Sequence, residues 1–218
     1  MTFRLISILA EGKTEQVFVT HCLRPHFERQ GVRLKVTLAR PGRRADSSGG
    51  VQNYDAIRAD ILSLLSEPGK PIVTTMIDYY RRPSNMPGNE SVSNSSSAEL
   101  VSYLEGKWRD DIGYPQRFIP YYSLHEFEAL LFSNTKIVST FFPGHDAAND
   151  LEQIVKQVSS PENINETPEG APSKRLEKLL RYKKALHGPQ IANKIGLSDI
   201  RKTCPHFNEW LSRLEALR

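Results

Sequence analysis

Cysteine is scarce in this chain of 218 residues, whose two cysteines, Cys22 and Cys204, lie far apart. Two cysteines without a C-x-x-C pair exclude a disulfide framework and give no zinc-finger spacing. Because unpaired thiols are typical of reducing compartments, we expect a cytoplasmic protein. No apolar run approaches the roughly 20 residues of a membrane helix, and the apolar start of the chain is too short for a signal peptide. We therefore expect no membrane partner.

The glycine fingerprints of common nucleotide-binding proteins are missing as well. Neither a G-x-x-x-x-G-K loop nor a G-x-G-x-x-G turn occurs in the sequence, and no G-x-S-x-G elbow supports serine catalysis. The composition is that of a globular protein, with 39% hydrophobic and 25% charged residues and a net charge of +4. This length corresponds to one domain, or to one domain with a small appendage.

Apolar periodicity predicts that strands and helices alternate in the first part of the chain. The expected strands cover residues 3–10, 32–39, 71–77 and 117–122. The expected helices cover residues 13–30, a segment capped by Asn53, residues 98–109 and residues 124–132. Such alternation favours an α/β fold with a mostly parallel sheet flanked by helices, here a core spanning residues 1–133.

The pattern changes in the remainder of the chain. Residues 134–218 contain helical segments at 151–158, 174–182 and 200–218, the last broken at Pro205, and no strand-like run. We expect a helical C-terminal region that packs on the core.

Carboxylates follow the predicted strands at the points where they end. Glu11 follows the first strand, Glu15 lies one helical turn later, and Asp78 ends the third strand. Glu126 and Glu128 open the helix after the fourth strand. The carboxyl ends of parallel strands meet at one edge of a sheet, and convergent oxygen ligands suit Mg²⁺ or Mn²⁺. A metal held there can orient a water and neutralise charge that develops on a phosphodiester.

Each of these acids also has a structural explanation. The helix dipole favours Glu15 in a first turn, and Asp78 can cap the loop that follows it. On an α-helix, Glu126 and Glu128 point about 200° apart, so we expect that they do not face one site. We favour Glu128, because it lies at the edge of the buried stripe. That stripe consists of Leu124, Phe127 and Leu131.

Positive charge gathers in a few segments. Between residues 174 and 202 there are nine Lys or Arg residues against two acids, and a second cluster precedes Gly49 and Gly50. Such patches suit a polyanion, although a solvated surface explains them equally well. Ser173 is expected to cap a helix whose start would offer a phosphate site. The residues expected to bind a nucleic-acid backbone are Arg43, Arg44, Lys174, Arg175, Lys183 and Lys184.

Several strings resemble known families. The string ILAEGKTE at residues 8–15 resembles the opening motif of Toprim domains, especially in nucleases of the overcoming-lysogenization-defect type. The string MIDYY at residues 76–80 falls where Toprim domains carry D-x-D. Over nearly its whole length, the chain resembles a bacterial Toprim-like family catalogued as domain of unknown function 4276. The strings that carry this resemblance are HEFEALLF at 125–132, TPEGAPSKRL at 167–176 and CPHF at 204–207.

The resemblance implies roles for individual residues. Glu11 would be the metal-binding or general-base glutamate, Glu15 a second acid of the metal site, and Asp78 the first aspartate of the pair. Tyr80 stands where the second aspartate is expected, and Glu126 or Glu128 would then restore a ligand. Relatives in this wider group resemble partners of an ATPase in anti-phage systems, which implies an ATPase subunit as partner.

Residues and resemblance together favour a Mg²⁺- or Mn²⁺-dependent nuclease that acts on DNA or RNA, with Glu11, Asp78 and Glu128 as catalytic residues. One alternative is a non-catalytic module that binds nucleic acid or an ATPase through a degenerate Toprim site. Another is a phosphohydrolase of small nucleotides. Converging acids would favour an enzyme, whereas acids neutralised by Arg or Lys would favour the module. The sequence leaves open whether the chain forms a homo-oligomer.

Overall fold

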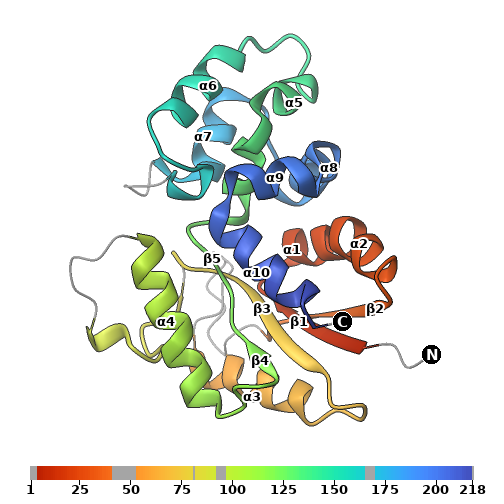
Figure 1. The fold of residues 1–218 in the computed structure, drawn as a ribbon. Coiled ribbons are helices and arrows are strands. Elements are labelled where there is room, and N and C mark those ends of the chain that lie inside the picture. Colours follow the sequence, from red (N-terminus) through yellow and green to blue (C-terminus); the bar gives the residue numbers. More distant parts are fainter. Residues whose placement is uncertain (1–3, 41–52, 81, 92–96, 165–169, 218) are drawn as a thin grey trace.

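A five-stranded parallel sheet forms the centre of the protein, seen here in a computed structural model (Figure 1). The structure describes residues 4–40, 53–80, 82–91, 97–164 and 170–217. The strands are β1 (Arg4–Ala10), β2 (Val32–Leu38), β3 (Ile72–Asp78), β4 (Phe118–Ile119) and β5 (Tyr122–Ser123). Their order is β2-β1-β3-β4, and β5 pairs with the end of β3. The predicted α/β fold with a mostly parallel sheet is confirmed.

The predicted strand at residues 117–122 is divided into β4 and β5. Pro120 lies between the two short strands, and a proline has no backbone N–H for the ladder. β5 therefore pairs further along β3, where Asp78 lies opposite Ser123.

Helices cover both faces of the sheet because β1 alternates its side chains between them. Ile6 and Ile8 pack into one buried cluster with the helices that follow β1 and with the C-terminal helices. Leu9 packs into a second cluster on the opposite face, with α3 (Tyr54–Leu65) and α4 (Ser97–Ile112). As predicted, Asn53 caps α3, its side chain accepting the backbone N–H of Asp55.

The helix predicted at residues 13–30 is one continuous helical segment in three parts. α1 (Lys13–Phe18) runs into a π-helical turn, η1 (Val19–Leu23), and then into α2 (Arg24–Glu28). Pro25 lies near the start of α2. Because proline has no backbone N–H, it cannot donate a hydrogen bond to a carbonyl of the preceding turn.

As expected, the described residues after 134 form helices joined by turns and loops, and no strand occurs among them. A 3₁₀ helix, η3 (Phe127–Asn134), leads into this region, where an α-helix was predicted at 124–132. The further helices are α5 (Thr135–Thr140), α6 (Ala148–Lys156), η4 (Pro161–Asn163), α7 (Pro172–Leu179), α8 (Lys184–Ile195), α9 (Leu197–Thr203) and α10 (Pro205–Glu215). A short 3₁₀ turn, η2 (Asn89–Ser91), precedes α4.

The C-terminal region returns to the sheet through α10 (Figure 1). Trp210 Nε1 donates a hydrogen bond of 2.8 Å to Thr74 Oγ1 in β3. Phe18 of α1, Leu176 of α7 and Trp210 belong to one buried cluster, so the C-terminal helices and the sheet share a hydrophobic core. Within the described ranges, no helix combines the length and the apolar character needed to cross a membrane.

Candidate active site

Acidic side chains from separate segments meet where β1 and β3 end. Glu11 directly follows β1, and its Oε2 accepts the backbone N–H of Asp78 at 2.8 Å. Asp78, the last residue of β3, accepts the backbone N–H of Phe127 on its Oδ1 at 3.2 Å. Two strand ends and the start of η3 are thus joined through carboxylates.

Glu15 lies beside this pair in the first turn of α1. Its Oε2 accepts the backbone N–H of Gly12 at 2.9 Å, which closes the helix start. The structural explanation for Glu15 therefore holds. However, Glu15 is also close enough to Asp78 for its charge to raise the pKa of that carboxyl. One carboxylate caps a helix and belongs to the acidic cluster at the same time.

Glu126 and Glu128 face the same cation. Lys184, the first residue of α8, places its Nζ 3.3 Å from Glu126 Oε1 and 3.0 Å from Glu128 Oε2. The expectation that the two glutamates cannot share a site is wrong. Glu126 has an extended backbone (φ −143°, ψ 156°) before a 3₁₀ helix, so the α-helical angle of 100° per residue does not apply between them.

Glu126 and Glu128 each have a further donor. Tyr182 Oη donates to Glu128 Oε1 at 3.1 Å, and the backbone N–H of Ser173 donates to Glu126 Oε2 at 3.0 Å. Ser173 is not the N-cap that the sequence suggested, since α7 begins at Pro172 after the N-cap Ala171. The positive end of α7 therefore stabilises a carboxylate of the protein itself.

We define the acidic cluster as Glu11, Glu15, Asp78, Glu126 and Glu128. Burial raises the pKa of Asp78 well above its ordinary value, and the charges of Glu11, Glu15 and Glu128 raise it further. Burial also raises the pKa of Glu128 to about 7, with Lys184 opposing this effect. The pKa of Glu126 is lowered, because Lys184 and the N–H of Ser173 outweigh its burial. Burial and like charges in the cluster thus oppose ionisation of Asp78 and Glu128, and Lys184 offsets this effect only in part.

The donor set suits a hard divalent cation, since it offers carboxylate oxygens whose mutual repulsion such a cation would relieve. Nevertheless, no three His, Cys, Asp or Glu side chains in the described ranges are already arranged to hold a metal ion. Binding would therefore require carboxylates to change rotamer, or Lys184 to withdraw. Tyr80, in the position of the expected second aspartate, is 43% exposed, in contrast to the buried Asp78.

The predicted nucleic-acid-binding residues have different surroundings. Arg43 and Arg44 lie outside the described residues. Lys174 pairs with Glu177 on the surface at 2.7 Å. Arg175 donates from Nε to Gly170 O at 2.6 Å. Lys183 is exposed just before α8, whereas Lys184 is directed toward the acidic cluster.

Gly188 is an important residue of the site that the sequence did not reveal. A Cβ atom at this position would lie 2.7 Å from Tyr182 Oη, 3.2 Å from Phe127 Cε1 and 3.4 Å from Thr14 Cγ2. Glycine thus lets α8 approach α1 and η3 one turn after Lys184. The Gly-Pro pair at 188–189 normally indicates a turn, and no helix was predicted over 184–195.

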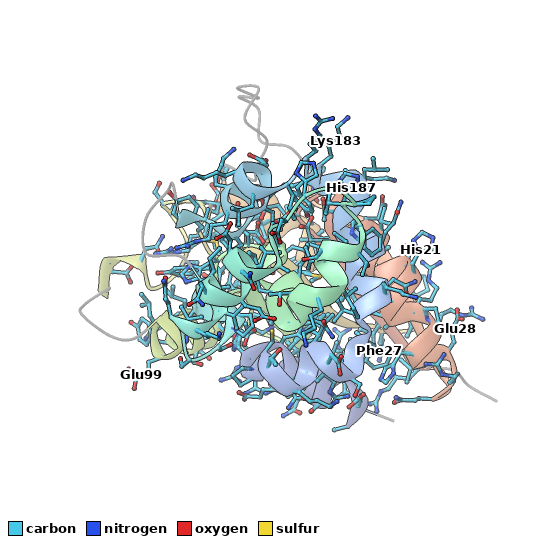
Figure 2. All side chains as sticks on the ribbon, turned by 90° about the horizontal axis from the view of Figure 1, so that it is seen from above. His21, Phe27, Glu28, Glu99, Lys183 and His187 are labelled. Carbon is cyan, nitrogen blue, oxygen red and sulfur yellow. The ribbon has the colours of Figure 1, made fainter. Side chains whose placement is uncertain are left out.

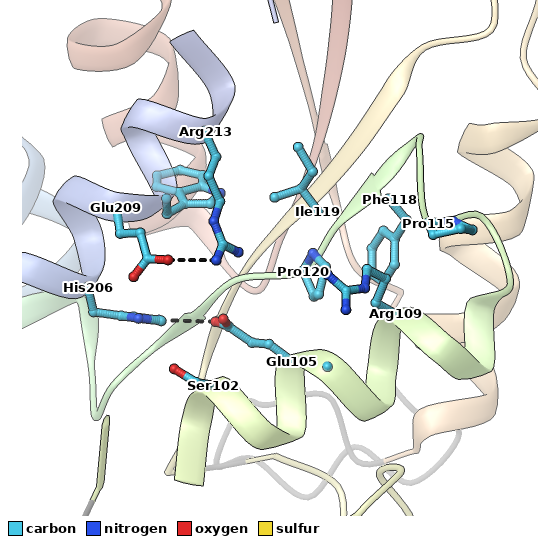
Figure 3. Close-up of a pocket in the computed structure, with 12 residues that line it drawn as sticks. Ser102, Glu105, Arg109, Pro115, Phe118, Ile119, Pro120, His206, Glu209 and Arg213 are labelled. Atoms are coloured by element: carbon cyan, nitrogen blue, oxygen red, sulfur yellow. Dashed lines mark hydrogen bonds and ion pairs between the residues drawn. The ribbon is translucent and has the colours of Figure 1, made fainter. Parts of the chain in front are cut away.

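A separate pocket of about 370 Å³ lies between α4 and α10 (Figure 3). Glu105 and His206 face each other there, with His206 Nε2 3.0 Å from Glu105 Oε1. The exposed Arg213 pairs with Glu209 at 2.6 Å. No member of the acidic cluster lines this pocket in the described structure.

Comparison with protein families gives one match. The family described as Domain of unknown function (DUF4276) matches residues 10–215, which include the whole acidic cluster and nearly all of the chain. The chain therefore belongs to this family. No curated protein and no solved structure matches the chain.

Proposed function

We propose that this member of the DUF4276 family is a Mg²⁺- or Mn²⁺-dependent nuclease that hydrolyses phosphodiester bonds in DNA or RNA. The observation that carries the proposal is the convergence of the acidic cluster at the carboxyl end of the parallel sheet. Purely structural acids gain nothing from meeting one another in a buried place, where like charges oppose ionisation. Strongly perturbed carboxylates in one place are typical of functional sites. The resemblance of residues 8–15 to the Toprim motif supports the same function.

The acidic cluster would hold the metal ion. A bound divalent cation would supply Lewis-acid stabilisation of the charge that develops on the phosphate. Glu11, which is only half-buried, would act as the general base toward an attacking water. Lys184, whose side chain is 40% exposed, would offer its ammonium group to a phosphate oxygen. Asp78 positions Glu11 through the hydrogen bond from its backbone N–H.

Cleavage of plasmid DNA and of a labelled RNA tests the proposal in the presence of Mg²⁺, Mn²⁺ or EDTA. We expect metal-dependent cleavage by the wild type and a loss of at least about 100-fold in Glu11→Gln and in Asp78→Asn. Glu177→Gln removes a surface carboxylate and serves as the matched control, with unchanged cleavage expected. Circular dichroism checks that each variant is folded. Cleavage that persists in both site variants would refute the assignment.

The ion pairs of Lys184 favour a second candidate function. A cation already placed between Glu126 and Glu128 is what a degenerate site would contain, so the chain would be a non-catalytic module that binds nucleic acid or an ATPase subunit. Such a module fits the anti-phage context that the resemblance implies. It predicts no cleavage with any metal and no thermal stabilisation by Mn²⁺. Stabilisation by Mn²⁺ that Asp78→Asn abolishes would argue against it.

A further inference from the structure

A second surface feature lies beyond the C-terminal ends of α1 and α8, whereas the acidic cluster lies at their N-terminal ends. It is a groove of about 650 Å³ between the η1–α2 segment and the α8–α9 junction. We call it the basic groove, because its titratable lining, apart from the buried thiol of Cys22, is His21, His26, Arg29, Arg201 and Lys202. No Asp or Glu in the described part of the chain lines it. A groove with one sign of charge attracts ligands of the opposite sign.

The cations of the basic groove divide into two kinds. Arg201 is fully engaged: it donates to Glu215 at 2.7 Å, Asn208 at 2.7 Å and Ser212 at 3.0 Å, and thus shapes the wall. Arg29 is exposed and has no acidic partner among the described residues. Lys202 pairs with Asp199 at 3.1 Å, but both side chains are exposed. Such surface pairs are worth about 0 to 1 kcal/mol, so Lys202 can exchange its partner for a phosphate.

The two helices that line the groove also begin at the acidic cluster. α1 begins beside Glu15 and continues through η1 to His21, while α8 begins with Lys184 and continues to Asn193. The two segments touch at the groove, where Cys22 Sγ lies 3.6 Å from Asn193 Oδ1. From Lys184 to Asn193 the helical rise amounts to about 14 Å. This corresponds to about four nucleotide steps of a duplex.

The start of α8 and the basic groove lie on one side of the molecule. Lys183 and His187, at the start of α8, and His21, beside the groove, lie along the same side of the view in Figure 2. Lys183 precedes the residue that enters the acidic cluster, and His21 lines the basic groove. One side of the molecule therefore carries both Lys183, next to the acidic cluster in the chain, and the basic groove.

We infer that the basic groove binds the phosphate backbone of a polynucleotide several nucleotides away from the bond held at the acidic cluster. Arg29, Lys202 and His21 are the contacting residues, and Arg201 positions the wall. The inference deepens the proposed function and rests on it for the bond that is cut. The binding of the backbone itself needs neither a metal nor cleavage.

Binding measured in EDTA tests the inference. The full chain is titrated against fluorescent 20-nucleotide DNA, RNA and duplex DNA by anisotropy, between 50 and 200 mM salt. Arg29→Ala with Lys202→Ala should weaken binding roughly tenfold at 50 mM salt and reduce the salt slope by about 1 to 2. Lys107→Ala with Arg213→Ala is the charge-matched control, since both residues are exposed on α4 and α10. The control should bind within about twofold of the wild type.

The outcomes separate this inference from the proposed function. A wild type that binds no polynucleotide, or a groove variant that binds like the control, overturns the inference even if the wild type cleaves DNA. Loss of binding in the groove variant alone supports the inference even if no cleavage is found. The DNA, RNA and duplex arms show which polynucleotide the groove prefers.

Discussion

Ionisation of Glu128 should reduce the stability of the folded protein, and Glu128→Gln should remove this effect. The side chain is 1% exposed, and burial is the largest cause of its raised pKa. Lys184 compensates only in part. A neutral amide of the same shape cannot ionise. The difference in unfolding free energy between variant and wild type should therefore depend on pH.

The magnitude and sign follow from the pKa. In the folded protein the pKa rises from the ordinary 4.5 to about 7. One pKa unit corresponds to about 1.4 kcal/mol, so ionised Glu128 costs about 3 kcal/mol. Below pH 4.5 the carboxyl is protonated in both states and costs nothing. Between pH 4.5 and 7 the unfolded chain releases the proton while the folded chain retains it, and wild-type stability falls.

Chemical denaturation in EDTA at a series of pH values from about 4.5 to 8 measures this difference. The free energy of unfolding of Glu128→Gln relative to wild type should rise by about 3 kcal/mol across this interval and then level off. Glu177→Gln, which removes an exposed carboxylate, should show no comparable trend. A Glu128→Gln difference that stays constant within about 1 kcal/mol would refute the reasoning. If the proposed metal site is correct, saturating Mn²⁺ should reduce the difference, because the cation stabilises the ionised carboxylate.

Two further predictions concern packing and a second titrating group. Gly188→Ala should destabilise the protein by roughly 1 to 3 kcal/mol, because the added Cβ meets Tyr182 Oη at 2.7 Å; an unchanged Tm would contradict the close approach of α8. Burial lowers the pKa of His206, but Glu105 and Glu162 outweigh it and raise the pKa overall. This stabilisation is full below the unfolded pKa of 6.5 and disappears as pH rises through the folded value. Denaturation should therefore show that His206→Gln lowers the free energy of unfolding by about 2 kcal/mol at pH 5.5 and by less at pH 8.5. Equal losses at the two pH values would contradict the raised pKa of His206.

Much of the fold could be predicted because the signals are local. The alternation of strands and helices, the cap at Asn53 and the break at Pro205 each depend on a few neighbouring residues. The predictions failed where backbone geometry departs from the standard periods. At 127–134 the chain forms a 3₁₀ helix where an α-helix was expected. At 184–195 it forms a helix despite a Gly-Pro pair.

The sequence by itself determined that acids follow the strands, and the parallel sheet then brings Glu11 and Asp78 together. Only the tertiary structure decided that Glu126 and Glu128 share one cation and that this cation is Lys184. In the sequence, Lys184 is one of nine positive residues in a basic segment. Its position depends on Gly188, which lets α8 pack against α1 and η3, residues far away in the chain. Periodicity describes a residue relative to its neighbours, whereas this contact depends on how distant segments pack.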